Sequence, residues 1–395
     1  MQTPSYGYRA AHWRLSGYYV AFFSVYAITI PLWPRWLEGQ LPLEFVGVVL
    51  GGAYWGKLLF VPATSWIADR IGRRRPLLVA LALILLGGVL LLPLFDHWIF
   101  YALIWGIAGA ALSSGVPLSD GLTMRASQLL GIEFGKTRKW GSISFIVATL
   151  LVGFCVDRFG LDAIYVALVV TSCQLVGAAF WVPGLQTRPN KAGVPFFKPL
   201  VLPNFPLFVL TVSLLMSSHA ALYGFSAIHW KALGYSNTTI TLLWVLGVVA
   251  EICMFNLSGR LIGRFGAMPM ISLAALGGVV RWTLLAWGTS LPVLGLAQLL
   301  HAFTFALLYM ALIGYMTKRV PPDISASAQG LYDSLSMGIF FGFLTMLAGY
   351  LFGIDPAYSF LLMTGCSVIG FGLSLVLLVR VRRFEREQSP VSAPS

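Results

Sequence analysis

Seven ionisable residues lie inside long apolar stretches of the sequence. In chain order they are Lys57, Asp120, Arg138, Glu251, Arg281, His301 and Asp333. A charge near the centre of a bilayer costs at least ~2.5–3.5 kcal/mol, so each such residue invites a functional explanation. Carboxyl and imidazole groups can carry protons, and the cationic side chains can hold an anion.

Glu251 is the most unusual of the seven because its neighbours in sequence carry no charge. It precedes Arg264 by 13 residues, which is ~20 Å along a helix, so we expect it near the membrane midplane. Low-dielectric surroundings favour a neutral carboxyl group, which makes Glu251 a candidate proton carrier. Lys57 precedes Arg70 by the same 13 residues. We hypothesise that Lys57 and Glu251 face each other across a central cavity; the alternative is a fixed structural ion pair.

The elements that must position these residues are membrane-spanning helices. Of the 395 residues 58% are hydrophobic and only 10% charged, against ~25% charged in soluble proteins. This composition excludes disordered, collagen-like and disulfide-rich proteins and a soluble enzyme. A spanning helix needs about 20 apolar residues. We therefore predict an all-α polytopic membrane protein with twelve transmembrane helices, at 13–34, 43–67, 76–95, 98–118, 138–157, 160–183, 205–229, 237–257, 267–288, 292–316, 327–351 and 357–380.

The net charge of +12 is explained by orientation in the membrane. With the N-terminus inside, 21 of the 26 Lys and Arg residues fall in cytoplasmic segments, Arg188 and Lys191 among them. Only Arg35, Arg158 and Lys231 fall outside. The positive-inside rule then places both termini in the cytoplasm, with anionic lipid beside the basic loops. Nucleic-acid binding is excluded, because it needs basic residues gathered on one face.

A repeat divides the chain into two pseudo-symmetric six-helix halves. The segment 65–72 recurs as 259–266, and each copy joins the second and third helices of its half. We predict an N-terminal half at 1–184, a cytoplasmic linker at 185–204, a C-terminal half at 205–384 and a polar tail at 385–395. Duplicated six-helix units are typical of secondary transporters whose substrate site lies between the halves near the midplane.

The first copy of the repeat resembles the signature loop of the major facilitator superfamily, Gly-x-x-x-Asp-Arg-x-Gly-Arg-Arg, with Ser65 in place of the first glycine. Gly72 permits a tight turn, and Asp69 can pair with arginines or with a helix N-terminus. We expect this loop to latch the inner face in one conformation. Asp333 stands near the start of the eleventh helix, where the helix dipole favours an acid. The predicted gate comprises Asp69, Arg70, Gly72, Arg73, Arg264 and Asp333.

A second resemblance is to the lactose permease family. The segment 134–141 is similar to the start of its fifth helix, which implies that Arg138 binds substrate with Asp120 as its partner. Arg281 and His301, 20 residues apart, match the arginine and histidine of its proton-coupling network.

The departures from that family concern its charged residues. Gln298 stands where the family has a lysine, and Thr304 where it has the glutamate that carries the coupled proton. Glu251 falls about one turn from the sugar-binding glutamate. Lactose recognition is therefore not expected here.

The segments 219–228, 246–251, 278–282 and 298–301 are similar to bacterial 3-phenylpropionate permeases. This resemblance implies an aromatic monocarboxylate as substrate, which needs a cationic anchor and an aromatic wall. Arg138, Arg281 or Lys57 could supply the anchor, Arg being the better planar fork for a carboxylate. The predicted substrate site comprises Asp120, Arg138, Lys57, Tyr26, Tyr223, Trp244 and Gln298.

The function expected from these features is proton-coupled uptake of a small organic solute by alternating access, in a bacterial inner membrane. Glu251, His301 and Arg281 are the predicted coupling residues, whereas His219 and His229 are expected to be interfacial or helix-packing residues. We expect a monomer with no metal and no cofactor other than the coupled proton, and no enzymatic activity. Three alternatives remain open: a sugar or nucleoside symporter, a proton-antiport exporter, and a sensor that binds without transporting.

Overall fold

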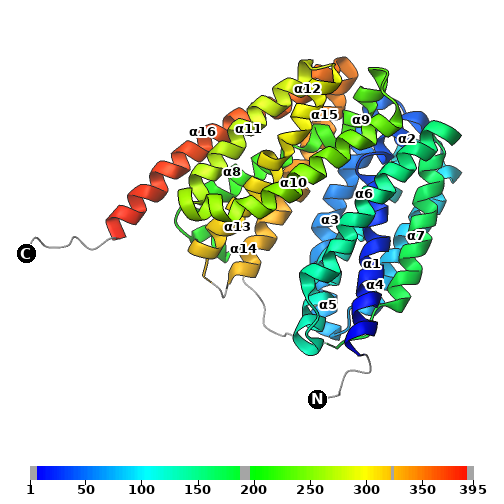
Figure 1. The fold of residues 1–395 in the computed structure, drawn as a ribbon, viewed down its shortest axis with the longest axis horizontal. Helices are drawn as coiled ribbons and strands as arrows, with labels where there is room; N and C mark the ends of the chain where they lie inside the picture. The colour runs from blue at the N-terminus through cyan, green and yellow to red at the C-terminus, as the bar shows by residue number, and fades with distance from the viewer. Residues whose placement is uncertain (1–6, 187–195, 322–323, 389–395) are drawn as a thin grey trace, which may run out of the picture. The chain divides into compact units, whose positions relative to one another are not determined.

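The protein is described by a computed structural model covering residues 7–186, 196–321 and 324–388. Almost all of these residues are helical (Figure 1). Within the described residues, eleven helical spans are long and apolar enough to cross a membrane, and a twelfth forms if the bent pair of helices Tyr8–Thr29 and Trp33–Gln40 counts as one span. These spans coincide with the twelve predicted from the sequence, which confirms the all-α polytopic fold.

The first six spans are built from seven helices. α1 is bent from α2 by 46°, with Pro34 in the first turn of α2. The helices are α1 (Tyr8–Thr29), α2 (Trp33–Gln40), α3 (Leu43–Ile71), α4 (Arg75–Leu91), α5 (Trp98–Leu130), α6 (Phe134–Phe159) and α7 (Ala163–Trp181). Asp120 lies well inside α5, not at the end of a helix at 118 as predicted. The helix continues through Pro117 and stops only at Gly131, whose φ is +70°.

Three of the other six spans are interrupted. The seventh consists of α8 (Phe205–Ser217) and α9 (Ala220–Ala232), separated by Ser218 and His219. The tenth and eleventh contain π-helical segments, which are frequent at functional sites. The elements are α10 (Asn237–Phe265), α11 (Ala267–Trp287), α12 (Leu291–Leu299), η3 (Ala302–Leu307), α13 (Leu308–Arg319), α14 (Ser325–Asp333), η5 (Ser334–Phe340), α15 (Phe341–Ile354) and α16 (Pro356–Gln388).

The chain forms two compact units. Unit 1 comprises residues 1–192, 221–245 and 342–354, and unit 2 comprises 193–220, 246–341 and 355–395. The predicted six-helix halves are defined by the sequence repeat and not by these contacts, so that division stays a prediction. Arg188 and Lys191, parts of the predicted linker and most of the predicted tail lie outside the described residues.

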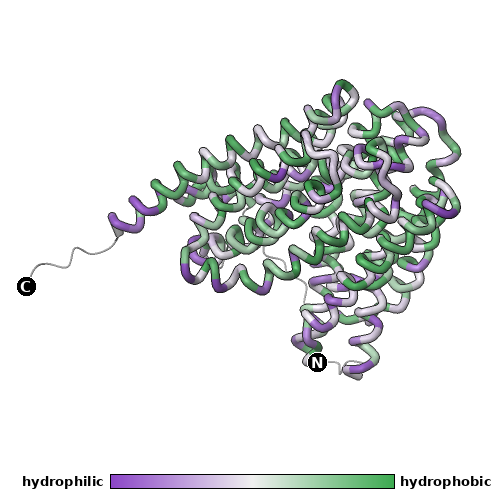
Figure 2. Tube along the Cα trace, turned by 45° about the horizontal axis from the view of Figure 1, so that its top comes forward, coloured by the Kyte–Doolittle hydropathy of each residue, from purple (hydrophilic) through white to green (hydrophobic). Residues whose placement is uncertain are grey.

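The core of unit 2 holds α11 in place. α11 and α16 lie side by side (Figure 1) and approach closely where Gly278 faces Ser367. A hydrogen bond of 2.8 Å joins the hydroxyls of Ser272 and Ser374 across the same pair of helices. Hydrophilic residues gather in the last turns of α16 (Figure 2), where Arg383 and its basic neighbours lie beyond the apolar span. The middle of α11 therefore packs closely against α16.

Candidate functional site

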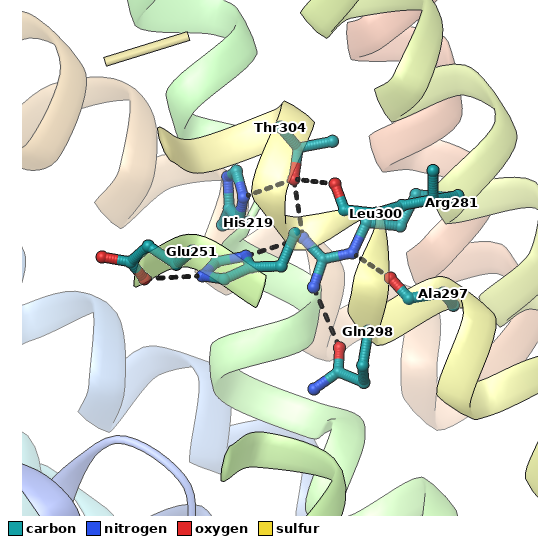
Figure 3. A network of polar contacts seen from close by, with 8 residues as sticks. His219, Glu251, Arg281, Ala297, Gln298, Leu300 and Thr304 are labelled. Atoms are coloured by element: carbon teal, nitrogen blue, oxygen red, sulfur yellow. Dashed lines mark hydrogen bonds and ion pairs between the residues drawn. The ribbon is translucent and has the colours of Figure 1, made fainter. Parts of the chain in front are cut away.

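Arg281, in the middle of α11, is completely buried and makes four hydrogen bonds (Figure 3). Its Nε donates to the carbonyl of Ala297 at 2.8 Å, and its Nη2 donates to Oε1 of Gln298 at 2.9 Å. Its Nη1 donates to Oγ1 of Thr304 at 2.8 Å and contacts Nδ1 of His301 at 3.0 Å. The guanidinium group thus contacts one face of the tenth span, which carries positions 297, 298, 301 and 304.

The contact with Arg281 determines which nitrogen of His301 carries the proton. A guanidinium only donates, so Nδ1 of His301 must accept. The proton of the neutral ring then sits on Nε2, which lies 3.3 Å from Oε2 of Glu251 in α10. One neutral imidazole therefore links a buried cation to a carboxylate. The structure brings together the three predicted coupling residues from α10, α11 and the tenth span.

Local helix geometry helps to align this network. Gly247 lies one turn before Glu251 and faces Gln298 and His301, so α10 approaches the tenth span closely there. His301 immediately precedes the π-helical segment η3, which contains Thr304. A π segment adds a residue to a turn and rotates the later part of the helix by ~100°. The side chains that follow His301 in the tenth span therefore point in other directions than they would in an uninterrupted α-helix.

His219 also belongs to this network, contrary to the expectation that it only packs. Its Nε2 lies 3.2 Å from Oγ1 of Thr304, and its Nδ1 lies 2.9 Å from the carbonyl of Met216. The signal that could have identified His219 is local, because Ser217, Ser218 and His219 are three consecutive polar residues within an apolar span. The ring of His229 contacts that of Phe352 edge-on, with 6.3 Å between the centroids.

A second charged cluster lies in unit 1. Nε of Arg138, in α6, lies 3.5 Å from Oδ1 of Asp120, in α5. The hydroxyl of Tyr19, in α1, donates to the same oxygen at 2.7 Å and lies 3.0 Å from Thr123. Both charged side chains remain about one-third exposed. The predicted partnership of Asp120 with Arg138 is therefore present in the structure.

Aromatic side chains from α1 surround Arg138. Its guanidinium carbon lies 3.9 Å from the ring centre of Phe23 and 5.2 Å from that of Tyr19. Tyr26 packs on Phe23 at 5.7 Å between centroids. Cation–π contact of this kind stabilises a guanidinium that is partly out of water. Arg138 thus combines a charge suited to a carboxylate with an aromatic environment.

The remaining predicted substrate residues are placed in both units. Tyr223 and Trp244, in unit 1, contact each other with ring centroids 5.5 Å apart. Gln298, in unit 2, accepts a hydrogen bond from Arg281. Lys57, in α3, belongs to unit 1 and Glu251 to unit 2, so their predicted meeting across a cavity stays a hypothesis.

The signature loop forms the turn expected between α3 and α4. Gly72 ends α3 with φ of +67°, a left-handed conformation that glycine adopts without strain. Nη2 of Arg74 lies 3.8 Å from Oδ1 of Asp69, and burial lowers the pKa of Arg74 while Asp69 raises it. Arg70 stacks on the ring of Trp66 at 5.0 Å, and the backbone of Arg73 pairs with that of Gln186.

The other two predicted gate residues lie in unit 2. The guanidinium of Arg264, in the last turn of α10, lies 5.2 Å from the ring of Phe265. Asp333 lies near the start of the eleventh span, as expected, but it is the last residue of α14. The helix begins at Ser325, two turns earlier, and the dipole argument does not apply there. A gate formed with Asp69 stays a prediction.

In the part of the chain that the structure describes, twelve apolar spans, counting the bent pair, with an arginine, a histidine and a glutamate linked inside them, define a polytopic membrane protein. Residues 12–362 match the model of the MFS_1 like family, and the chain belongs to that family. It is therefore a transporter of the major facilitator type, which implies a small-molecule substrate.

Named relatives span nearly the whole chain. A probable 3-phenylpropionic acid transporter of Escherichia coli is 32% identical over 354 residues, covering 87% of this chain and 92% of that protein. A maltose permease of Geobacillus stearothermophilus is 26% identical over 391 residues, covering 94% and 95%. The crystal structure of the nucleoside transporter NupG superposes with a TM-score of 0.77 at 16% identity, covering 94% of this chain and 99% of that one. The last likeness concerns the fold alone.

Proposed function

We propose that the protein is a proton-coupled symporter that takes up an aromatic monocarboxylate across a bacterial inner membrane by alternating access. The observation that carries this proposal is the contact of Glu251 with His301 and, through it, with buried Arg281. Proton coupling requires a group that exchanges a proton inside the membrane and changes the charge of the site when it does so.

Glu251 meets that requirement better than His301. A second cation beside the buried guanidinium of Arg281 is unfavourable, so the added proton belongs on the carboxyl group. Nε2 of His301 already carries a hydrogen, so the proton binds the Glu251 oxygen that does not face His301. Protonation removes the negative charge that His301 links to Arg281, which makes the interior of the protein more favourable for an anion. Proton and carboxylate are then expected to bind together and cross together.

Arg138 is the proposed anchor for the carboxylate of the substrate. Its side chain is partly exposed, is held by a partly exposed Asp120 and stacks on aromatic rings of α1. A guanidinium can bind a carboxylate with two parallel hydrogen bonds, and the rings offer a surface for an aromatic group. The relative named for 3-phenylpropionic acid supports the same substrate class.

The first test uses purified protein in proteoliposomes with an imposed pH gradient, acid outside, and radiolabelled 3-phenylpropionate. We expect gradient-driven accumulation in the wild type and a loss of about tenfold or more in Glu251→Gln, which cannot ionise. Exchange of substrate without a gradient should continue in this variant, because exchange needs no net proton movement. Glu44→Gln, at an exposed acid in the first turn of α3, serves as control and should behave as wild type.

A sugar symporter is the second candidate, because the maltose permease relative matches 94% of the chain. Maltose and uridine are therefore run in parallel with 3-phenylpropionate. Accumulation of maltose or uridine without accumulation of 3-phenylpropionate would support proton coupling and contradict an aromatic substrate. Expulsion of substrate under an acid-outside gradient would identify an exporter, and undiminished coupled uptake by Glu251→Gln would remove Glu251 from the coupling step.

A further inference from the structure

The break in the seventh span places three consecutive side chains on three different neighbours. Oγ of Ser217 donates to the carbonyl of Ser336 in η5 at 2.8 Å. Oγ of Ser218 accepts from the indole nitrogen of Trp282 in α11 at 3.1 Å. His219 contacts Thr304 in the tenth span. All three side chains are buried, so the break is joined to the ninth, tenth and eleventh spans at one level.

The contacts of His219 with Met216 and Thr304 determine which ring nitrogen carries the hydrogen. The carbonyl of Met216 can only accept, so Nδ1 of His219 carries the hydrogen and donates it there. Nε2 is then an acceptor, and the hydroxyl of Thr304 must donate to it. The oxygen of Thr304 thereby keeps its lone pairs for Nη1 of Arg281 at 2.8 Å. The hydrogen bonds are therefore donated in one direction: from Arg281 to Thr304, from Thr304 to His219, and from His219 to the carbonyl of Met216.

Thr304 has an alternative acceptor, and His219 determines which one it uses. The carbonyl of Leu300 lies 3.4 Å from Oγ1 of Thr304, at the long limit for a hydroxyl hydrogen bond, against 3.2 Å to Nε2 of His219. Without His219 the hydroxyl would turn toward Leu300, and its lone pairs would rotate away from Arg281. The same nitrogen of Arg281 contacts His301, so the change would reach the coupling histidine.

We propose that His219 is a positioning residue of the Arg281 site: it orients the hydroxyl of Thr304 and through it holds the guanidinium against His301. This inference rests on the proposed proton coupling. His219 does not carry the transported proton, because its Nδ1 is committed to a carbonyl and a second buried cation beside Arg281 is unfavourable. The break in the seventh span, which contains His219, therefore contacts the coupling residues through Thr304.

Two amide substitutions separate the two hydrogen bonds of His219. Glutamine places an amide oxygen near the position of Nε2 and keeps an acceptor for Thr304. Asparagine places an amide N–H near the position of Nδ1 and keeps a donor for the carbonyl of Met216. We expect His219→Gln to retain gradient-driven uptake and His219→Asn to lose about tenfold while still exchanging substrate.

The partner position supplies the matched test. Thr304→Ser keeps the hydroxyl, and Thr304→Val removes it at similar volume. We expect Thr304→Ser to behave as His219→Gln does and Thr304→Val as His219→Asn does. The double variant His219→Asn with Thr304→Val should lose no more than Thr304→Val alone, because removal of the hydroxyl already removes the contact with His219. If His219→Asn retains uptake and His219→Gln loses it, the proposal is overturned in favour of a structural role for the contact with Met216.

An infrared measurement separates this inference from the proposed function. The carboxyl band of Glu251, identified by its absence in Glu251→Gln, reports protonation of Glu251 without any transport. In His219→Asn the pH midpoint of this band should move upward, because ionised Glu251 loses support from Arg281 and His301. In His219→Gln it should stay in place. An unmoved midpoint in His219→Asn would overturn the positioning role. If the two variants show the expected midpoints but the wild type shows no proton-coupled uptake, only the proposed function is overturned.

Discussion

At the scale of single residues, the site depends on a side chain with several donors in fixed directions. Arg281 binds a carbonyl, an amide oxygen, a hydroxyl and an imidazole with one planar group. An ammonium group is a compact charge on a flexible stem and cannot reproduce this fork. The charge of Arg281 is therefore only part of its contribution, because the planar fork also holds several acceptors in fixed directions and its contact with Nδ1 sets the tautomer of His301.

Arg281→Lys tests that statement, because it keeps the charge and removes the fork. We expect proton-driven uptake to fall by about tenfold or more, since at least two buried acceptors lose their donor. The measurement is uptake in proteoliposomes at equal amounts of folded protein, assessed by gel filtration. Arg382→Lys, at an exposed position of α16, is the control and should retain full uptake. Equal activity of Arg281→Lys and the control would mean that charge alone suffices.

At the scale of helices, one carboxylate joins α6 to the start of α10. Oδ1 of Asp157 accepts from the backbone and side-chain nitrogens of Asn237, each at 2.8 Å. Oδ2 accepts from the backbone nitrogen and the hydroxyl of Thr238 at 2.8 and 2.7 Å. These amides belong to the first turn of α10, where backbone donors have no partner within the helix. Asp157 therefore acts as an N-cap supplied by another helix.

Asp157→Asn should loosen the first turn of α10, because an amide cannot accept at both of its terminal atoms. Loss of an N-cap costs ~1 kcal/mol, so amide hydrogen exchange at Asn237 and Thr238 should become roughly fivefold faster. Asp162→Asn is the control, since Asp162 precedes α7 without making a side-chain cap. Unchanged exchange in Asp157→Asn would show that other contacts hold the start of α10.

Helix phase explains which parts of the site could be predicted. Glu251, Arg281 and His301 stand out because charge is rare in apolar spans, and a family resemblance grouped the last two. The contacts of His219 and Thr304 depend on a break in the seventh span and a π segment in the tenth. Neither irregularity has a strong sequence signal, and each changes the direction of every later side chain.

At the scale of the whole molecule, the distribution of basic residues predicts orientation. Successive spans alternate in direction, so the loop between α5 and α6 and the loop between α6 and α7 lie on opposite sides of the membrane. The excess of Lys and Arg on one side predicts that this side is cytoplasmic. The turn between α3 and α4, which directly follows the last turn of α3 with Asp69, lies on the same side of the membrane as the loop at Glu133.

Cysteine labelling tests this orientation directly. In a variant without the four native cysteines, Asp162→Cys should react with a membrane-impermeant maleimide in intact cells. Glu133→Cys should react only after the membrane is permeabilised. Both positions are exposed, so access to the reagent depends on the side of the membrane. The reverse pattern would invert the predicted topology and place both termini outside.

The amino-acid sequence by itself determined the number and place of the spans, because a bilayer demands about 20 apolar residues in each helix with its backbone satisfied internally. It also identified the charges that the membrane tolerates least. Only the tertiary structure decided which of those charges meet, that Glu251 reaches Arg281 through His301, and that Thr304 and His219 support them. The physical reason is that hydropathy depends on composition along the chain, whereas a hydrogen bond depends on the rotation of each helix. Breaks and π segments set that rotation through packing with other helices.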